Sequence, residues 1–223
     1  MQRYESKNFF TRFMEYFLPL FPLKLIAYPG EQVNLHIFED RYKQLVSECI
    51  QEDVHFGIPV YLDNRLEYGT EMSVEKIIET YPDGRMDIIT QAHRVFRIVD
   101  FTNPAPGKLY AGGEVIFLDN IYDDTDEKAR QHMLQLAREL FQLLNLSDSV
   151  KINKDITVFD LGHKLGLPFQ KQYRLLQLER ESDRQLFIIE HLEKTLPVMQ
   201  EMEYAKERIR LNGHFRKFDP LDF

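Results

Sequence analysis

The spacing of apolar residues changes near residue 122, and this change constrains the fold more than any other feature of the chain. Before it, short runs rich in β-branched and aromatic residues alternate with turn signals, which is typical of strands in a mixed or barrel-like sheet. After it, apolar residues recur every three or four positions, which is typical of amphipathic helices. We therefore predict an N-terminal extension over residues 1–17, a β-rich module over 18–122 and a helical subdomain over 123–223.

A hairpin is predicted around Pro82-Asp83-Gly84, which separates two runs of strand-forming residues, 75–81 and 85–90. Proline presets φ at the first central position of a turn, and glycine accepts a positive φ at low cost. The two runs are therefore expected to pair as neighbouring antiparallel strands.

Residues 40–50 are predicted to form a helix inside the β-rich module, because their apolar side chains recur at helical spacing. Cys49 lies on the apolar side of this helix and is the only cysteine of the chain. It is expected to be a small buried residue rather than a reactive thiol. A lone cysteine also favours a reducing compartment, so a cytoplasmic location is expected.

Several residues of the β-rich module are expected to have structural roles. Glu39 and Arg41 are predicted to form an ion pair that holds a turn. His36 lies in an apolar run and is predicted to be a core or hydrogen-bonding residue rather than a metal ligand. Four apolar residues are expected in the core: Phe38, Phe56, Phe96 and Ile98.

Two capping patterns mark helix starts in the second half. Asp124 is predicted to be an N-cap with Glu127 three residues later, so the acidic run there needs no metal to explain it. Ser182 and Gln185 form the same pattern ahead of a long helical repeat.

The last helical repeat contains Pro197. Proline removes a backbone donor and clashes with the preceding turn, so a kink or two abutting helices are expected there. Met199 and Met202 follow on one stripe. They are predicted to lie either in the core or in a dimer seam, and the core is the favoured interpretation.

Composition and charge indicate a folded protein without a membrane span. Of the 223 residues, 43% are hydrophobic and 29% are charged, and no segment reaches the roughly 18 uninterrupted apolar residues that a spanning helix needs. The formal net charge of −8 opposes binding to a polyanion such as nucleic acid.

The motifs of common catalytic and metal sites are missing from the sequence. No Gly-x-x-x-x-Gly-Lys-Ser/Thr loop is present to hold nucleotide phosphates. No histidine belongs to a His-Glu-x-x-His pattern, and one cysteine is too few for a four-sulfur zinc site. No serine has the setting of a nucleophile such as Gly-x-Ser-x-Gly. We therefore predict no catalytic residues, no metal site and no cofactor.

A set of short motifs resembles the Lon substrate-binding domain, which is the N-terminal module of the ATP-dependent protease Lon. The resemblance extends from about residue 18 to about residue 210. Its motifs in the β-rich module are Leu18-Pro19-Leu20-Phe21-Pro22-Leu23, Tyr28-Pro29-Gly30, Leu35 to Tyr42, Phe56-Gly57-Ile58, Tyr68-Gly69-Thr70, Pro82 to Arg85 and Arg94 to Ile98. Its motifs in the helical half are Leu161 to Leu167, Tyr173 to Gln177 and Arg184 to Leu192.

The resemblance implies an α+β protein with a β-barrel module of the type associated with pseudouridine synthases (PUA-like), followed by a C-terminal helical bundle. It implies a non-enzymatic protein that binds exposed segments of unfolded or damaged polypeptides, as an adaptor or regulator of proteolysis. A separate ATP-dependent protease and a second copy of the chain are the other expected partners.

Five residues are the candidates for peptide contact, because prolines beside aromatic side chains in loops can stay exposed. These residues are Phe21, Pro22, Tyr28, Pro29 and Tyr42. Packing in the core is an equally good explanation for each of them.

Two other functions stay open. The barrel type resembles modules that bind RNA, and a basic stripe near the C-terminus supports this alternative although the acidic balance opposes it. The third interpretation is a small-molecule pocket or enzyme at the mouth of the barrel, although no group of residues specifies a reaction. The basic stripe consists of Lys206, Arg208, Arg210, Arg216 and Lys217.

Overall fold

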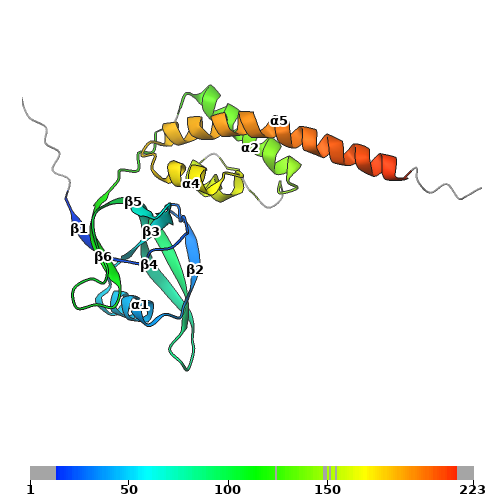
Figure 1. Ribbon diagram of the computed structural model, residues 1–223. Helices are drawn as coiled ribbons and strands as arrows, with labels where there is room; N and C mark the ends of the chain where they lie inside the picture. Colours follow the sequence, from blue (N-terminus) through cyan, green and yellow to red (C-terminus); the bar gives the residue numbers. More distant parts are fainter. Residues whose placement is uncertain (1–13, 124, 148–149, 151, 154, 215–223) are drawn as a thin grey trace, which may run out of the picture. The chain divides into compact units, whose positions relative to one another are not determined.

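The computed structural model describes residues 14–123, 125–147, 150, 152–153 and 155–214. The chain forms two compact units, one up to Asp119 and the other from Asn120 onward. The first contains the strands and one helix, and the second contains the remaining helices (Figure 1). The protein is thus a mixed α+β protein, as the sequence predicts. The predicted domain bounds and the description of the two parts as a barrel and a bundle stay predictions.

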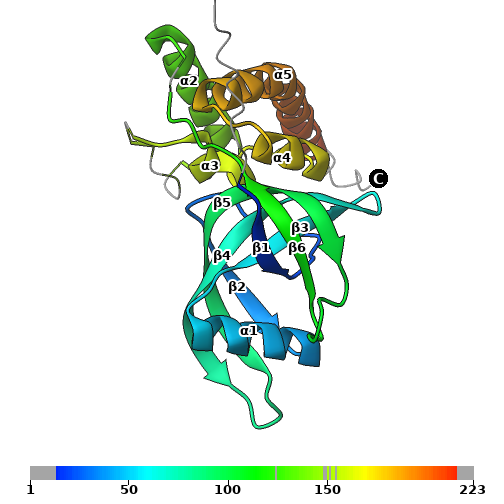
Figure 2. The same cartoon turned by 90° about the vertical axis from the view of Figure 1, so that its left-hand side faces the viewer.

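The first unit is built on a six-stranded sheet with the order β2-β5-β4-β3-β1-β6. Its neighbours are antiparallel except β1 and β3, which are parallel. β6 pairs with both β1 and the second half of β5, so the strands β5, β4, β3, β1 and β6 form a closed ring of pairings (Figure 2). The strands are β1 (Tyr16–Leu20), β2 (Gln32–Ile37), β3 (Phe56–Leu62), β4 (Arg65–Thr80), β5 (Met86–Thr102) and β6 (Ala111–Phe117).

The hairpin between β4 and β5 confirms the turn predicted around Pro82-Asp83-Gly84. Thr80 faces Met86 across the antiparallel pair, and the Tyr81 N–H donates to the Arg85 carbonyl at 2.8 Å. Gly84 has φ +81°, the left-handed conformation that glycine adopts without strain.

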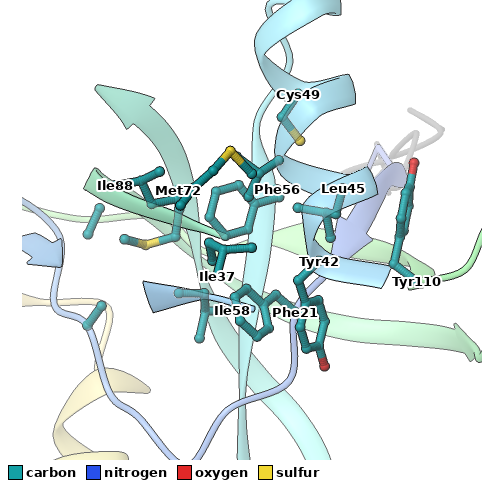
Figure 3. Packing of buried hydrophobic residues seen from close by; sticks show 14 residues of the cluster. Phe21, Ile37, Tyr42, Leu45, Cys49, Phe56, Ile58, Met72, Ile88 and Tyr110 are labelled. Atoms are coloured by element: carbon teal, nitrogen blue, oxygen red, sulfur yellow. The ribbon is translucent and has the colours of Figure 1, made fainter. Parts of the chain in front are cut away.

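The helix of the first unit within the described residues, α1 (Asp40–Glu52), covers the main core cluster. Its inward side carries Tyr42, Leu45 and Cys49, which pack with Phe56 and other strand residues (Figure 3). The predicted helix over 40–50 and the buried position of Cys49 are confirmed. Burial raises the pKa of the Cys49 thiol to about 12, so the thiol stays protonated and unreactive at neutral pH.

One predicted core residue of the first unit is exposed. Phe56 and Phe96 are buried and Ile98 is half-buried, but Phe38 is 59% exposed. Phe38 follows the end of β2, where the chain turns into α1, so the alternation of the strand no longer determines its side. His36 is also exposed, and its Nδ1 lies 2.6 Å from Asp87 Oδ1, which confirms the hydrogen-bonding alternative.

In the part of the second unit that the structure describes, the elements are α-helices and one 3₁₀ turn. The long helix α5 contacts α2, and His132 of α2 lies 2.9 Å from Glu193 of α5. The elements are α2 (Glu127–Leu143), α3 (Val158–Leu161), the turn η1 (Gly162–Lys164), α4 (Phe169–Leu176) and α5 (Glu181–His214).

Aspartates other than the predicted capping residues bind first-turn backbone donors of α2 and α5. Helix α2 is capped by Asp126, whose Oδ1 accepts from the Ala129 N–H at 2.9 Å; Asp124 lies outside the described residues. Ser182 lies inside α5, and both its N–H and its hydroxyl donate to the carboxylate of Asp123. Asp123 thus binds a free backbone donor of the first turn of α5, although the two residues are 59 positions apart in the sequence.

Helix α5 continues through Pro197 as one helix, so of the two expected outcomes the pair of abutting helices is wrong, and a kink stays a prediction. Leu196 is the last buried residue of this helix up to Arg210. Met199 is half-buried, and Met202 is 56% exposed. The favoured core position is therefore wrong for Met202.

Candidate functional site

A cavity of about 450 Å³ in the first unit brings candidate contact residues together. This volume lies within the usual range of ligand pockets, about 300–1,000 Å³. Apolar and aromatic side chains provide most of the walls. The lining residues are Pro22, Leu23, Lys24, Arg41, Tyr42, Tyr61, Leu66, Phe101, Asn103 and Ala111.

The loop after β1 forms one wall because it is held against β3. The Leu23 N–H donates to the Pro59 carbonyl at 3.1 Å, and the Tyr61 N–H donates to the Leu23 carbonyl at 2.8 Å. Leu23 also forms an isolated parallel bridge with Val60. These bonds use the backbone groups of the loop, so its side chains line the cavity on a fixed support.

An aromatic side chain of the lining comes from Tyr61, which lies near the end of β3 and is 46% exposed. Its hydroxyl donates to Asn64 Oδ1 at 2.8 Å. Asp63 and Asn64 both have positive φ and form a two-residue turn between β3 and β4, the geometry that matches the twist of a hairpin. The turn thereby positions the Tyr61 ring at the cavity.

Arg41 and Tyr42 bring α1 to the cavity. Arg41 Nη2 lies 2.7 Å from Glu39 Oε2, which confirms the predicted ion pair, and its guanidinium carbon lies 4.5 Å from the centre of the Tyr42 ring. Tyr42 stacks on Phe21 with 3.7 Å between ring centres. Burial raises the pKa of Tyr42 more than the nearby Arg41 lowers it, so its hydroxyl stays protonated at neutral pH.

The structure divides the five candidate contact residues. Pro22 and Tyr42 line the cavity, and Phe21 is a buried neighbour that supports the Tyr42 ring. Tyr28 has a side chain with no exposed area, and Pro29 precedes the turn glycine Gly30 away from the lining set. Contact of any of the five with a peptide stays a prediction.

The remaining lining residues were not found by sequence reasoning. Tyr61 and Leu66 face each other across the β3–β4 hairpin, and this pair meets Phe101 and Asn103 only because β4 and β5 are neighbours in the sheet. The Asp63-Asn64 turn is the one local signal that could have placed Tyr61 at a hairpin end.

A second polar cluster of the first unit has a structural role. The Glu71 side chain is 5% exposed, and Arg94 donates to its two oxygens at 2.7 and 2.9 Å. His55 Nδ1 lies 3.1 Å from the same carboxylate, and the His55 ring stacks on His93 at 4.7 Å. Burial raises the pKa of Glu71, but the bonds from Arg94 and His55 outweigh burial and lower it overall.

Among the described residues, no group of three or more His, Cys, Asp or Glu side chains could hold a metal ion. The cavity is lined by aromatic, aliphatic, amide and cationic groups, which can bind an apolar chain with polar ends but lack a paired acid and base for general catalysis.

Comparison with solved structures defines the class of fold. The N-terminal domain of the Mycobacterium avium complex Lon protease matches with a TM-score of 0.60 over 80% of this chain and 98% of that one, at 15% identity. A Lon N-terminal domain protein from Xanthomonas campestris matches with a TM-score of 0.59 over 76% of this chain and 94% of that one, at 29% identity. The protein thus has the mixed α+β fold of Lon N-terminal domains.

The chain belongs to the Lon substrate-binding domain family. The family model described as the ATP-dependent protease La (LON) substrate-binding domain matches residues 17–197. A LON peptidase N-terminal domain and RING finger protein of Schizosaccharomyces pombe is 30% identical over an aligned length of 107, and the match covers 39% of this chain. The matched part is 22% of that relative, so this chain covers about a fifth of its length.

Proposed function

We propose that this protein binds exposed segments of unfolded or damaged polypeptides and acts as an adaptor or regulator of proteolysis. Membership of a substrate-binding domain family supports a protein-binding role. The matched family model describes the binding module of the protease, so the proposed role is non-enzymatic.

The observation that carries the proposal is the cavity lined by Tyr42, Tyr61 and Phe101. Unfolded chains expose the large apolar side chains that a folded protein buries, and aromatic walls bind such side chains with little dependence on sequence. Strand β2 offers a second element of recognition, since within the described residues it pairs only with β5. A peptide can add to a sheet edge through backbone hydrogen bonds.

The proposed partners include a second copy of the chain as well as a separate ATP-dependent protease. The exposed end of α5 is the surface proposed for self-association. Val198 and Met202 are each 56% exposed there, and Ile209 is 72% exposed. Apolar side chains of this size, spaced along one helix, are typical of a helix–helix contact.

RNA binding is the less supported alternative. Of the predicted basic stripe, Lys206, Arg208 and Arg210 lie on α5, where Lys206 is bound to Glu203 at 2.6 Å. Arg216 and Lys217 lie outside the described residues.

No described helix is long and apolar enough to cross a membrane. A cytoplasmic location is a separate part of the proposal.

The test is fluorescence anisotropy of the purified protein with a labelled, permanently unfolded polypeptide and, separately, with a labelled single-stranded RNA, over a salt series. We expect binding to the polypeptide that persists at high salt, because apolar contacts are little screened. Binding to RNA alone, lost as salt rises, would replace the proposal with a nucleic-acid role.

Two variants locate the binding surface. Tyr61→Ala removes an exposed aromatic ring from the cavity, and Phe38→Ala removes one from the same unit outside the cavity. We expect Tyr61→Ala to weaken polypeptide binding about tenfold, the equivalent of about 1.4 kcal/mol, and Phe38→Ala to leave it unchanged. An equal loss of polypeptide binding in both variants, or no loss in either, would remove the cavity from the proposal.

A further inference from the structure

The charged residues that line the cavity are both cations. Lys24 comes from the loop after β1 and Arg41 from the first turn of α1, and no carboxylate belongs to the lining among the described residues. The chain as a whole has a formal net charge of −8. The two cationic groups at the cavity therefore contrast with the acidic balance of the chain, and the charge of Arg41 is shared with the carboxylate of Glu39, which lies outside the lining.

Arg41 is positioned to bind a second carboxylate in addition to that of Glu39. Its Nε and Nη2 both donate to one oxygen of Glu39, at 2.9 and 2.7 Å, while its guanidinium lies over the Tyr42 ring. A guanidinium has five N–H donors in a planar fork, and one carboxylate oxygen uses only part of them. The stacking on Tyr42 and the bond to Glu39 hold the plane of the guanidinium, which lowers the entropy cost of a further bond.

The rest of the cavity suits the other parts of a peptide. Tyr61, Phe101 and Leu66 provide apolar walls for a large side chain, and the Asn103 amide provides both a donor and an acceptor for a peptide group. Cations and an apolar wall thus lie within one cavity. A ligand that satisfies both has a large apolar side chain next to a negative charge.

We propose that this cavity selects polypeptide segments in which an aromatic or large aliphatic side chain stands beside a single carboxylate. The carboxylate is either the free C-terminus of the chain or the side chain of an adjacent Asp or Glu. This inference rests on the proposed function and names the class of segment that the same cavity takes. A long acidic run is disfavoured because the net charge of −8 repels a polyanion.

Four labelled peptides with one shared Gly/Ser-rich sequence test the selection. The first ends in Phe with a free carboxylate, and the second is the same peptide with an amidated end. The third is amidated and has Glu before the Phe, and the fourth has Gln in place of that Glu. We expect each carboxylate peptide to bind about tenfold more tightly than its neutral counterpart, since one charge-assisted bond in a cavity is worth about a factor of ten.

Arg41→Gln is the variant that tests the assignment, with Arg41→Lys as the conservative change and Arg97→Gln as the control. Arg97 is exposed on β5 and is not part of the cavity lining. We expect Arg41→Gln to reduce the carboxylate preference to about twofold or less, Arg41→Lys to keep part of it and Arg97→Gln to keep it all. The ratio of two peptides on one protein sample does not depend on how much of that sample is folded.

The outcomes separate the inference from the proposed function. Carboxylate and neutral peptides that bind equally well to the unchanged protein would overturn the inference and leave polypeptide binding intact. A preference that survives Arg41→Gln would overturn the assignment to this cavity. Failure of every peptide, together with failure of the unfolded polypeptide, would overturn both. A preference in the first pair alone identifies the C-terminal carboxylate, and one in the second pair alone identifies an acidic side chain.

Discussion

Glu71 is a buried acidic residue whose ionised form stabilises the fold. Its carboxylate is nearly fully buried and is held by Arg94 and His55. Arg94 is itself 53% exposed and lies over the Phe117 ring at 3.6 Å. A buried charge with a removable partner is costly when the partner is lost, although the exposure of Arg94 reduces that cost through solvent screening.

We predict that Arg94→Gln lowers the free energy of unfolding at pH 7 by about 1–3 kcal/mol, because Glu71 loses its two strongest donors. The pKa of Glu71 in the folded protein is below its ordinary value of 4.5. The stabilisation from the ionised Glu71 is therefore complete above about pH 4.5. It decreases as the pH falls toward the pKa of Glu71 in the folded protein. The destabilisation by Arg94→Gln should accordingly shrink between pH 7 and pH 3.5.

Urea unfolding at a series of pH values measures this difference. Arg97→Gln, an exposed arginine on the same strand, is the matched control and should change the free energy of unfolding by less than about 0.5 kcal/mol. A destabilisation by Arg94→Gln that stays constant down to pH 3.5 would show that packing on Phe117, rather than the charge of Glu71, explains the loss.

At the scale of single residues, the sequence predicts burial well only where a residue lies inside a regular element. Cys49 and Phe56 lie on the inner side of α1 and β3 and are buried as expected. Phe38 lies beyond the end of β2, and Met202 lies on the part of α5 that follows its last buried residue; both are exposed. Periodicity identifies the apolar side of an element, but it does not tell how far the covering element extends.

Among the elements, β3 and β4 are packed closely at a glycine of β4. Gly69 pairs with Pro59, and a Cβ atom at Gly69 would lie 2.4 Å from the Ile58 carbonyl oxygen and 2.7 Å from Phe96 Cζ. The first of these neighbours is backbone, so it cannot move aside without shifting the strand. The glycine therefore sets the spacing of the two strands near the core.

We predict that Gly69→Ala lowers the free energy of unfolding by about 1–3 kcal/mol, through overpacking at this strand pair. Lys76→Ala on the exposed part of β4 is the control and should have little effect. Chemical unfolding followed by far-UV circular dichroism gives both values. A Gly69→Ala protein as stable as the unchanged one would mean that the two strands can separate at this point without loss.

Helix boundaries show why element ends are harder to predict than element types. The sequence predicts the helices correctly by their apolar spacing, but it assigns both N-caps to the wrong residues. Asp126 and the predicted Asp124 belong to one acidic run, so either is a suitable cap by composition. The cap of α5 comes from Asp123, which is distant in sequence, and no local pattern contains this information. The cavity is hidden from sequence reasoning for the same reason, because its walls meet through the order of the strands.

At the scale of the whole molecule, the exposed end of α5 carries an apolar stripe through which two copies could associate. Val198, Met202, Ala205 and Ile209 recur at steps of four, three and four residues along its exposed end, the spacing of a two-stranded coiled coil. In an antiparallel pair, Val198 meets Ile209 of the partner subunit and Met202 meets the partner's Ala205, so large and small side chains alternate across the seam.

The charges of this segment favour the same antiparallel arrangement. Glu201 and Glu203 precede Lys206, Arg208 and Arg210, all of them on the exposed part of the helix. Antiparallel pairing places the acidic start of one helix beside the basic end of the other, whereas parallel pairing brings like charges together. The pair that exists within one helix, Lys206 with Glu203 at 2.6 Å, is exposed and gives little stability by itself.

We predict that the protein forms a dimer and that Met202→Glu raises its dissociation constant at least about tenfold, because a carboxylate then lies in the apolar seam. Gln200→Glu adds the same charge to a neighbouring exposed position outside the stripe and should leave the dissociation constant nearly unchanged. Sedimentation velocity over a concentration series measures both. A protein that stays monomeric at all concentrations, or an equal effect of the two substitutions, would rule out this dimer seam. The exposed apolar stripe would then be the contact surface for a different protein.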